Sequence, residues 1–365
     1  VTAFAGSDGG GVHTAAVSGG AWDAPNGGLL DRRIQALATH PTDTNIVYAG
    51  TKAGLFKSSN GGANWVNVNT GLTNSDVRTI VINPTTPETL YAGTYGGGVF
   101  KSTNSATSWS AANTGIVGVD TNKVNALLID PSTPAKLYAA TANGIFRSTD
   151  SGANWVSPSV DVTTADVLSL AYASTNLFAG TNGGGVFISS DSGDNWSLDS
   201  TGLTNQFVNA VIVSNPASPT AAYAATANGL FRRTYSLGSW GDWAQVSTGM
   251  PPSPIVYALD ISPAGKIFAG TDQGIYNSAT GSSWTGLLTG LIQGRAIAVK
   301  PGDPTKTVAA FSGGGLFRSV DSGVTWLPAS TPLATALFAT SLVYKGDGTA
   351  VYAGSGSGVS RSTDD

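Results

Sequence analysis

The sequence contains no cysteine, and this absence excludes disulfide bonds, thiolate catalysis and cysteine-ligated metal or iron–sulfur sites. Histidine occurs only twice, so no histidine-based metal cluster is predicted. We therefore expect neither a metal ion nor another cofactor. Charged residues make up 11% of the chain and the net charge is −4. This balance excludes a nucleic-acid-binding surface that depends on net positive charge.

Long helix-forming and membrane-spanning segments are also missing. Glu88 is the only glutamate among the 22 acidic residues, and methionine occurs once. No apolar run approaches the ~20 residues of a membrane span, so the chain is not expected to cross a membrane. The first residues lack the basic and apolar segments of a signal peptide, which suggests a mature or trimmed form. The low charge and the small polar residues are typical of exported bacterial proteins, which predicts an extracellular, cell-surface or periplasmic location.

The abundant residues favour strands and turns. Glycine occurs 48 times in 365 residues, and threonine, serine, asparagine and valine are plentiful. A segment of the form Tyr-Ala-Gly-Thr, followed by Gly-x-Phe-Lys/Arg-Ser and then by tryptophan, recurs with variations along the chain. Its copies begin at Phe4, Tyr48, Tyr91, Tyr138, Phe178, Tyr223, Phe268, Val308 and Tyr352. The starts lie about 44 residues apart, which is the length of one four-stranded propeller blade.

Each repeat is divided into four predicted strands, A to D. In the copy around Tyr138, residues 124–129 form strand A, residues 136–141 strand B and residues 145–148 strand C, and strand D begins near Trp155. Phe146 and Arg147 are neighbours on strand C, so their side chains point to opposite faces of the sheet. The phenylalanines at this position are therefore expected to pack between blades.

A second signature, Ser-x-Asp-x-Gly-x-x-Trp, connects strands C and D. Residues 148–155 and 319–326 match it in full, residues 58–65, 102–109 and 189–196 match it with changes, and the other copies are degenerate. The acidic or amide side chain can accept hydrogen bonds from N–H groups of the turn that follows. The glycine supplies a positive φ, and the tryptophan buries a large ring.

These motifs resemble those of the Asp-box, or bacterial neuraminidase repeat, β-propellers. This resemblance covers nearly the whole chain and implies an all-β propeller of four-stranded blades with Asp-box turns. The group includes sialidases, xyloglucan-degrading glycosidases, the sortilin-type propeller and the photosystem II assembly propeller, so it spans enzymes and non-enzymes. The Phe-Arg-Ile-Pro motif of sialidases is absent, which excludes sialidase activity.

The number of blades follows from counting strands. Strand A candidates begin at eight places, whereas strand B occurs nine times. We predict about eight blades, with seven or nine remaining open, in a single domain over residues 1–365. If strands from the two ends of the chain together completed one blade, the ring would have eight blades, and one pair of B and C strands would have no place in it. The sequence stops inside a copy of the turn motif, which suggests a fragment of a longer protein.

The B–C turns and the D–A connections of a propeller gather on one face, where partners usually bind. The turn position after Ala-Gly-Thr varies within a repeated frame, as a binding ring would require, although an idle turn would vary as well. We take four of these residues and one aromatic residue from an insertion as candidate binding residues: Lys52, Tyr95, Asn182, Asp272 and Trp240.

A catalytic role is the alternative interpretation of this face. Xyloglucan-degrading relatives carry an aspartate in a Thr-Asp-x-Gly context in the B–C turn, which Asp272 matches and Asp8 nearly matches. Such a pair could serve glycoside hydrolysis, although those enzymes are about twice as long. We therefore favour an exported, non-catalytic binding or scaffolding protein whose partner is a protein or a glycan. A glycoside hydrolase and an assembly factor for a membrane complex remain as alternatives.

Overall fold

The structure is a computed structural model, and all the elements that it describes are short antiparallel strands. It describes residues 2–362 apart from gaps at 8–10, 17–26, 32, 44, 119, 159–161, 163–164, 175, 215–218, 262–264, 290–293, 301–302, 304, 312–314, 321–326, 329–338, 345–350 and 356–357. Asp8 therefore lies outside the described residues. Among the described residues there is no helix that could span a membrane.

The chain divides into two compact units. Unit 2 comprises residues 70–248 and 252–256, and unit 1 comprises the remaining residues, 1–69, 249–251 and 257–365. Each unit is built from sheets in which strands neighbouring in sequence pair in order. The sheets of unit 2 are β7 (Val77–Ile82), β8 (Leu90–Thr94), β9 (Gly98–Ser102) and β10 (Ser110–Ala111); β11 (Val124–Ile129), β12 (Leu137–Thr141) and β13 (Gly144–Ser148); β14 (Val167–Ala173), β15 (Asn176–Thr181), β16 (Val186–Ser189) and β17 (Ser197–Leu198); and β18 (Val208–Val213), β19 (Ala221–Thr226), β20 (Gly229–Ser236), β21 (Ser239–Trp240) and β22 (Ala244–Gln245).

Unit 1 contains sheets of the same kind. They are β1 (Thr2–Ser7) and β2 (Gly11–Ala16); β3 (Ile34–Thr39), β4 (Val47–Thr51), β5 (Gly54–Ser58) and β6 (Val66–Asn67); β23 (Val256–Ile261), β24 (Ile267–Thr271), β25 (Gly274–Ser278) and β26 (Thr285–Thr289); β27 (Gly294–Val299), β28 (Thr307–Phe311), β29 (Gly315–Ser319) and β30 (Leu327–Pro328); and β31 (Ala339–Tyr344), β32 (Val351–Ser355) and β33 (Gly358–Ser362). Within the described ranges, β1 and β2 form a two-stranded sheet, which lies against β32 and β33.

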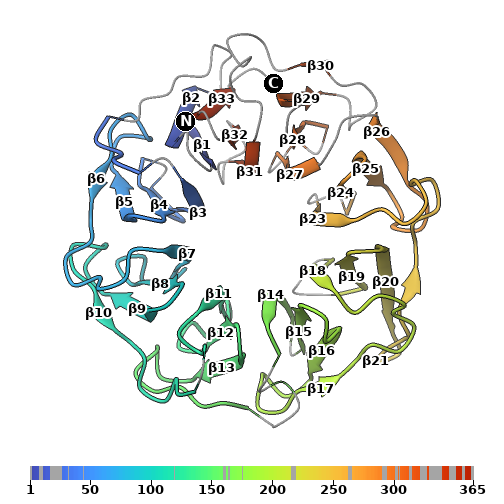
Figure 1. Ribbon diagram of the computed structural model, residues 1–365, viewed down its shortest axis with the longest axis horizontal. Coiled ribbons are helices and arrows are strands. Elements are labelled where there is room, and N and C mark those ends of the chain that lie inside the picture. The colour runs from blue at the N-terminus through green and yellow to red at the C-terminus, as the bar shows by residue number, and fades with distance from the viewer. Residues whose placement is uncertain are drawn as a thin grey trace. The chain divides into compact units, whose positions relative to one another are not determined.

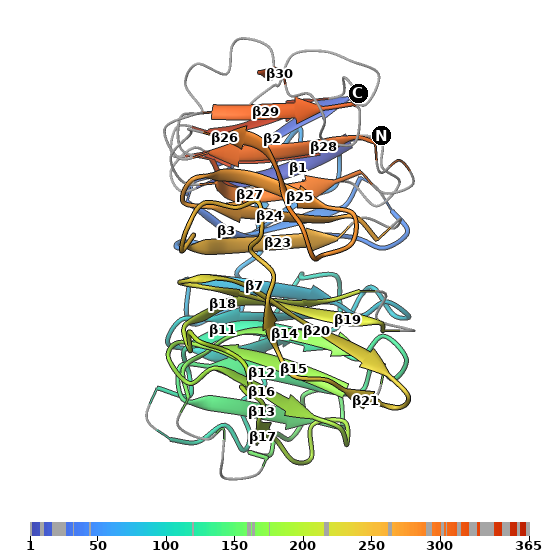
Figure 2. The same cartoon turned by 90° about the vertical axis from the view of Figure 1, so that its right-hand side faces the viewer.

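The predicted strands correspond closely to the observed ones. Strand A of the repeat around Tyr138 is β11, strand B is β12 and strand C is β13. In unit 2 the sheets pack face to face in the order of the sequence, with the A strands β7, β11, β14 and β18 on one side and the D strands on the other (Figure 1). The strands run side by side, so that their turns gather at two opposite ends of the unit (Figure 2). The B–C turns and the D–A connections lie at one end, which we call the loop end.

The turn between strands C and D has the predicted hydrogen bonds. Asp150 accepts hydrogen bonds from the Ser148 hydroxyl (2.8 Å) and from the backbone N–H of Asn154 (2.8 Å). The Asn154 side-chain amide donates to the second carboxylate oxygen at 2.8 Å, and together these donors hold the pKa of Asp150 at about 2. Gly152 has a φ of +78° and donates its N–H to the Ser148 hydroxyl at 2.9 Å. The turn is therefore closed by its own side chains.

The same turn also joins neighbouring sheets. The Tyr91 hydroxyl and the Lys101 ammonium, both from the preceding sheet, donate hydrogen bonds to the carbonyl oxygen of Ser151 at 2.9 and 2.7 Å. The Tyr138 hydroxyl contacts the Ser192 carbonyl in the same way in the next pair, at 2.8 Å. At these two junctions the tyrosine of strand B therefore binds the turn of the next sheet, and at the first junction the lysine of strand C does so as well.

A glycine and a tryptophan make the closest contact between successive repeats. The backbone N–H of Trp109 donates a hydrogen bond to the Thr70 carbonyl at 2.8 Å. A Cβ atom added to Gly71 would lie 2.0 Å from the Trp109 carbonyl oxygen, so only glycine fits there. The D–A connection before each such sheet is therefore held against the backbone of the tryptophan in that sheet. Equivalent contacts join Gly28 to Trp65, Gly115 to Trp155, Gly202 to Trp243 and Gly249 to Trp284.

One degenerate repeat has a different cluster of side chains in place of the closed C–D turn. Arg233 stands where the signature has serine, and its side chain is 6% exposed among the rings of Phe178, Trp240 and Trp243. Its guanidinium pairs with Asp199 from the preceding sheet. Burial lowers the pKa of Arg233 to about 10, against the charge of Asp242.

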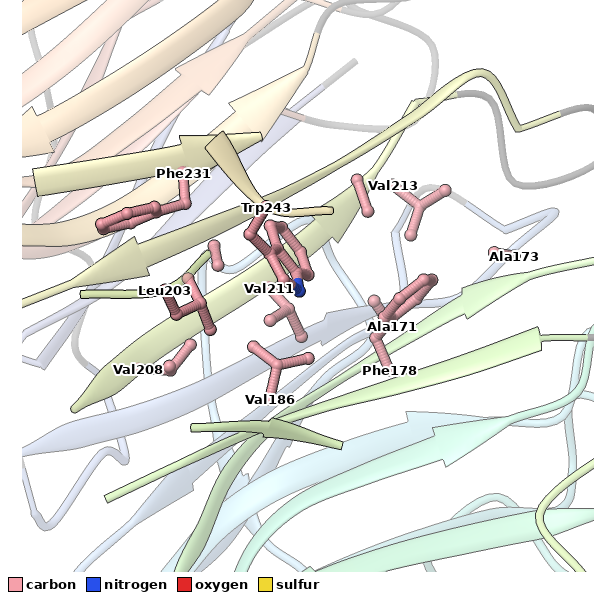
Figure 3. Close-up of a cluster of buried hydrophobic side chains, with 12 residues drawn as sticks. Ala171, Ala173, Phe178, Val186, Leu203, Val208, Val211, Val213, Phe231 and Trp243 are labelled. Carbon is pink, nitrogen blue, oxygen red and sulfur yellow. The ribbon is translucent and has the colours of Figure 1, made fainter. Parts of the chain in front are cut away.

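Phe178 and Trp243 belong to the apolar core between sheets β14–β17 and β18–β22 (Figure 3), and Trp240 packs against this core. Trp240 lies against Phe178 edge to face, with 5.0 Å between ring centroids, and also packs on Tyr235. The insertion is therefore anchored on the neighbouring sheet by apolar and charged contacts. Its hairpin turn, at Leu237 and Gly238, is exposed.

Asp260 ties two sheets of unit 1 together. It lies on β23 and accepts backbone hydrogen bonds from Ile261 (2.8 Å) and from Val299 of β27 (3.3 Å). Burial raises the pKa of Asp260 to about 6, although both N–H donors act in the opposite direction. Ionisation of this carboxyl therefore costs more in the folded protein than in the unfolded chain.

The Arg233–Asp199 pair gives a first prediction. Asp199→Asn should destabilise the protein by about 2–4 kcal/mol, because it leaves the buried guanidinium without its carboxylate. The double variant Arg233→Met/Asp199→Asn should recover at least half of this loss, since methionine keeps an apolar stem among the rings. Urea unfolding measures both free energies. A double variant that is as unstable as the single one would contradict this account.

The tip of the β20–β21 hairpin gives a second prediction. Leu237 and Gly238 have φ values of +51° and +84°, which are typical of a two-residue type I′ turn. Leu237→Asn should stabilise the protein by about 0.5–1 kcal/mol, because Asn tolerates the left-handed region better than leucine. Leu237→Ala is the control, since it removes the exposed side chain but keeps the strain. Equal unfolding free energies for both variants would refute the assignment of strain.

Asp260 gives a third prediction, on pH dependence. Its folded-state pKa of about 6 is raised above the usual aspartate value of 3.8, so the stability that the protonated carboxyl contributes is complete below pH 3.8 and is lost as the pH rises through 6. The stability of Asp260→Asn relative to the parent should therefore rise by about 1–2 kcal/mol between pH 3.5 and pH 7.5. The amide nitrogen cannot accept a hydrogen bond, so the variant loses one of the two bonds from Ile261 and Val299 at both pH values. Denaturant unfolding at the two pH values tests this. Asp303→Asn is the control, because the pKa of Asp303 is lowered and its loss should not stabilise the protein at pH 7.5.

Candidate functional site

A regular backbone frame forms the loop end of unit 2. In each sheet, the residue that opens the B–C turn donates its N–H to the carbonyl of the residue just before strand A. These four hydrogen bonds, of 2.8 to 3.0 Å, are Tyr95 to Asp76, Ala142 to Lys123, Asn182 to Asp166 and Ala227 to Phe207. We call these eight residues the rim. Their backbone pairing is repeated, whereas the pair of side chains is different in each sheet, with alanine and aspartate each occurring twice.

Neighbouring sheets are also joined along the rim. The N–H groups of Gly96 and Gly98 both donate to the Asn122 carbonyl at 2.9 Å. The Gly144 N–H donates to the Ala165 carbonyl at 2.7 Å, and the Gly185 N–H to the Gln206 carbonyl at 2.8 Å. Each B–C turn therefore rests on the start of the next sheet. This arrangement presents the side chains of the rim from a fixed backbone.

Tyr95 occupies the first junction between sheets. Its side chain is 40% exposed, and the Arg78 guanidinium and the Lys123 ammonium lie 4.5 and 5.4 Å from its ring centroid. Arg78 pairs with Asp76 at 2.9 Å, and Lys123 pairs with Asp120 at 2.8 Å. The ring is therefore held between two ion pairs.

Asp166 lies at the next junction along the rim. One of its oxygens accepts a hydrogen bond from the Asn125 amide at 2.9 Å, and the other from the Asn182 amide at 3.1 Å. The hydrogen bond of Lys123 to Asp120 raises the pKa of Lys123, and the charge of Asp166 adds to this effect. A lysine and a carboxylate from successive sheets thus lie near each other in the middle of the rim.

Phe207 forms the far end of this row. It is 52% exposed, and its ring lies beside the α-carbon of Gly183, because a Cβ atom built there would be 3.3 Å from the ring. It also forms an isolated β-bridge with Asn182, as Lys123 does with Tyr95. Two exposed aromatic rings therefore flank a polar centre at the loop end of unit 2.

The predicted binding residues are distributed over several places. Tyr95 and Asn182 both lie on the rim of unit 2. Lys52 and Asp272 occupy the equivalent turns β4–β5 and β24–β25 in unit 1. Trp240 follows the end of strand C, at the opposite end of its sheet from the B–C turn, and its ring packs on Phe178. The structure therefore does not bring Trp240 together with Tyr95 and Asn182.

Two rim residues, Lys123 and Phe207, were not among the sequence candidates. Both immediately precede the first valine of a strand A, the position that Asp76 and Asp166 occupy in other sheets. A comparison of that position across the repeats could have found them. A search for acidic residues alone finds Asp76 and Asp166 at this position but neither Lys123 nor Phe207.

The carboxylates of the rim are held by fixed partners. Asp76 is bound by Arg78, and Asp166 by two amides. In the described part of the chain, no group of three or more His, Cys, Asp or Glu side chains could hold a metal ion. These contacts suit the recognition of a ligand by an aromatic, charged and amide surface.

Comparisons with known proteins identify the fold. An ancestral GH74 enzyme has a TM-score of 0.61 at 18% sequence identity, with 96% of this chain and 56% of that chain covered. The extracellular domain of BT4673 from B. thetaiotaomicron has a TM-score of 0.58 at 17% identity, over 80% of this chain and 39% of that one. YCF48 from Cyanidioschyzon merolae has a TM-score of 0.52 at 17% identity, over 78% and 93% of the two chains. All three are β-propellers, and the likeness shows that this chain has a propeller fold.

The sequence itself gives no closer relationship. No protein-family model and no curated protein sequence matches the chain. The chain spans little more than half of the ancestral GH74 enzyme, at 56% of its length.

Proposed function

We propose that this chain is a single Asp-box propeller of about eight blades that acts as an exported, non-catalytic binding protein. Its partner is held at the loop end, on the B–C turns and the D–A connections. The observation that carries this proposal is the rim of unit 2, where a repeated backbone frame presents a different pair of side chains in each sheet. An exposed ring stands at each end of the polar centre, at Tyr95 and Phe207.

Two proteins of similar structure support an exported, binding role. BT4673 contributes an extracellular domain, and YCF48 is known in a form bound to the D1 peptide. A propeller of this kind can therefore serve outside the cell and can hold a protein segment. The fixed partners of Asp76 and Asp166 are consistent with recognition, because a general acid or nucleophile needs a carboxylate that is free to reach its substrate.

A selection followed by mutagenesis tests this function. The parent chain is screened against a display library of 12-residue peptides and against an array of soluble glycans. We expect Tyr95→Ala and Phe207→Ala each to weaken binding of the selected probe about tenfold or more, measured by calorimetry. Each removes an exposed ring that a ligand can bury.

Leu198→Ala is the matched control. Leu198 is 60% exposed but lies on β17, a D strand, so its truncation should leave the affinity unchanged. Equal losses in all three variants would contradict a site at the rim. Hydrolysis of xyloglucan by the parent, abolished in Asp272→Asn, would instead establish the glycoside hydrolase alternative.

A further inference from the structure

The order of the sheets determines how far apart the two exposed rings of the rim lie. Tyr95 is bridged to Lys123 at the junction of the first and second sheets of unit 2, and Phe207 is bridged to Asn182 at the junction of the third and fourth. The two junctions are two sheet-to-sheet steps apart. Packed sheets are about 10 Å apart, and Cα atoms of neighbouring A strands approach within 8 Å, so the rings are separated by roughly 15–20 Å along the rim.

The surface between the rings is low and polar. The rim positions there are Lys123, Ala142, Asp166 and Asn182, and Ala142 offers only a methyl group. Lys123 and Asp166 carry opposite charges, and the Asn182 amide is turned toward Asp166. Such a surface has both donors and acceptors for a backbone that lies across it, and it has no net charge to select a strongly acidic or basic ligand.

The surroundings of Tyr95 favour a side-chain ligand over a sugar. The Arg78 and Lys123 cations lie over its ring at 4.5 and 5.4 Å from the centroid. A pyranose that stacks on the ring would compete with these cations for its face. An apolar side chain can instead pack against the exposed edge of the ring and the aliphatic stems of the two cations.

We propose that the rim of unit 2 binds an extended peptide segment whose two apolar anchor residues are about six positions apart. An extended chain advances about 3.3 Å per residue, so five or six residues cover the roughly 15–20 Å between the rings. One anchor packs at Tyr95 and the other at Phe207. Between them, the peptide backbone lies over Ala142, within reach of Lys123, Asp166 and Asn182. This inference rests on the proposed binding function and names the ligand class of that site.

A series of synthetic peptides tests the spacing. Fluorescein-labelled peptides carry two tryptophans on a Gly/Ser/Asn frame of constant length and composition, three, six or nine positions apart. Fluorescence anisotropy with the full chain gives the dissociation constants. We expect the peptide with spacing six to bind at least tenfold more tightly than the other two, because it alone places both anchors at once.

Variants of both partners locate the anchors. Replacing one tryptophan of the spacing-six peptide with serine should weaken binding about tenfold to the parent. With Tyr95→Ala, replacing one of the two tryptophans should cost nothing further, and with Phe207→Ala the other tryptophan should become neutral. Leu198→Ala should behave as the parent does.

The outcomes separate the two levels of the proposal. Dissociation constants that do not depend on spacing would overturn the six-residue inference, and so would a glycan that binds through Tyr95 and Phe207 while no peptide does. In both cases the proposed binding function would stand if Tyr95→Ala and Phe207→Ala still weaken the binding of the probe. If no probe depends on either ring, the inference and the proposed function both fail.

Discussion

The contact between a connecting glycine and the backbone of the next tryptophan is the constraint on which the repeats depend. A sheet of four strands of about five residues is marginal by itself, so its stability must come from stacking on its neighbours. Gly71 lies against Trp109, and Gly115 against Trp155, at distances that leave no room for a Cβ atom. Each sheet is thus positioned by its predecessor through backbone atoms.

The side-chain contacts reinforce this arrangement in a fixed direction. Tyr91 and Lys101 of one sheet donate to the Ser151 carbonyl in the C–D turn of the next, and Tyr138 does the same for Ser192. In the sheet β18–β22, which lacks the closed C–D turn, Arg233 instead links the two sheets by pairing with Asp199 of the preceding sheet. Different chemistry therefore meets the same requirement, which is a polar link between sheets at their outer part.

The sequence was sufficient to predict what a single repeat contains. The strands, the buried phenylalanines and the closure of the C–D turn by Asp150 all follow from patterns of fewer than ten residues, and the structure has them. Contacts between repeats were less accessible, because their partners lie some 40 to 60 residues apart, as with Tyr91 and Ser151. The role of Trp240 depends on such a contact with Phe178, and its position in a glycine-rich insertion gave no sign of it. Lys123 and Phe207 join the candidate site only because the start of one sheet meets the turn of another.

The carboxylates of the packed sheets and those of the loop end have different surroundings. The carboxyl with a pKa of about 6, Asp260, accepts backbone hydrogen bonds from Ile261 and Val299 and so joins β23 to β27. At the loop end of unit 2, Asp76 and Asp166 are held instead by an arginine and two amides. The raised pKa of Asp260 therefore belongs to a carboxyl that is buried where two sheets pack, whereas the carboxylates of the rim are fixed by side-chain partners.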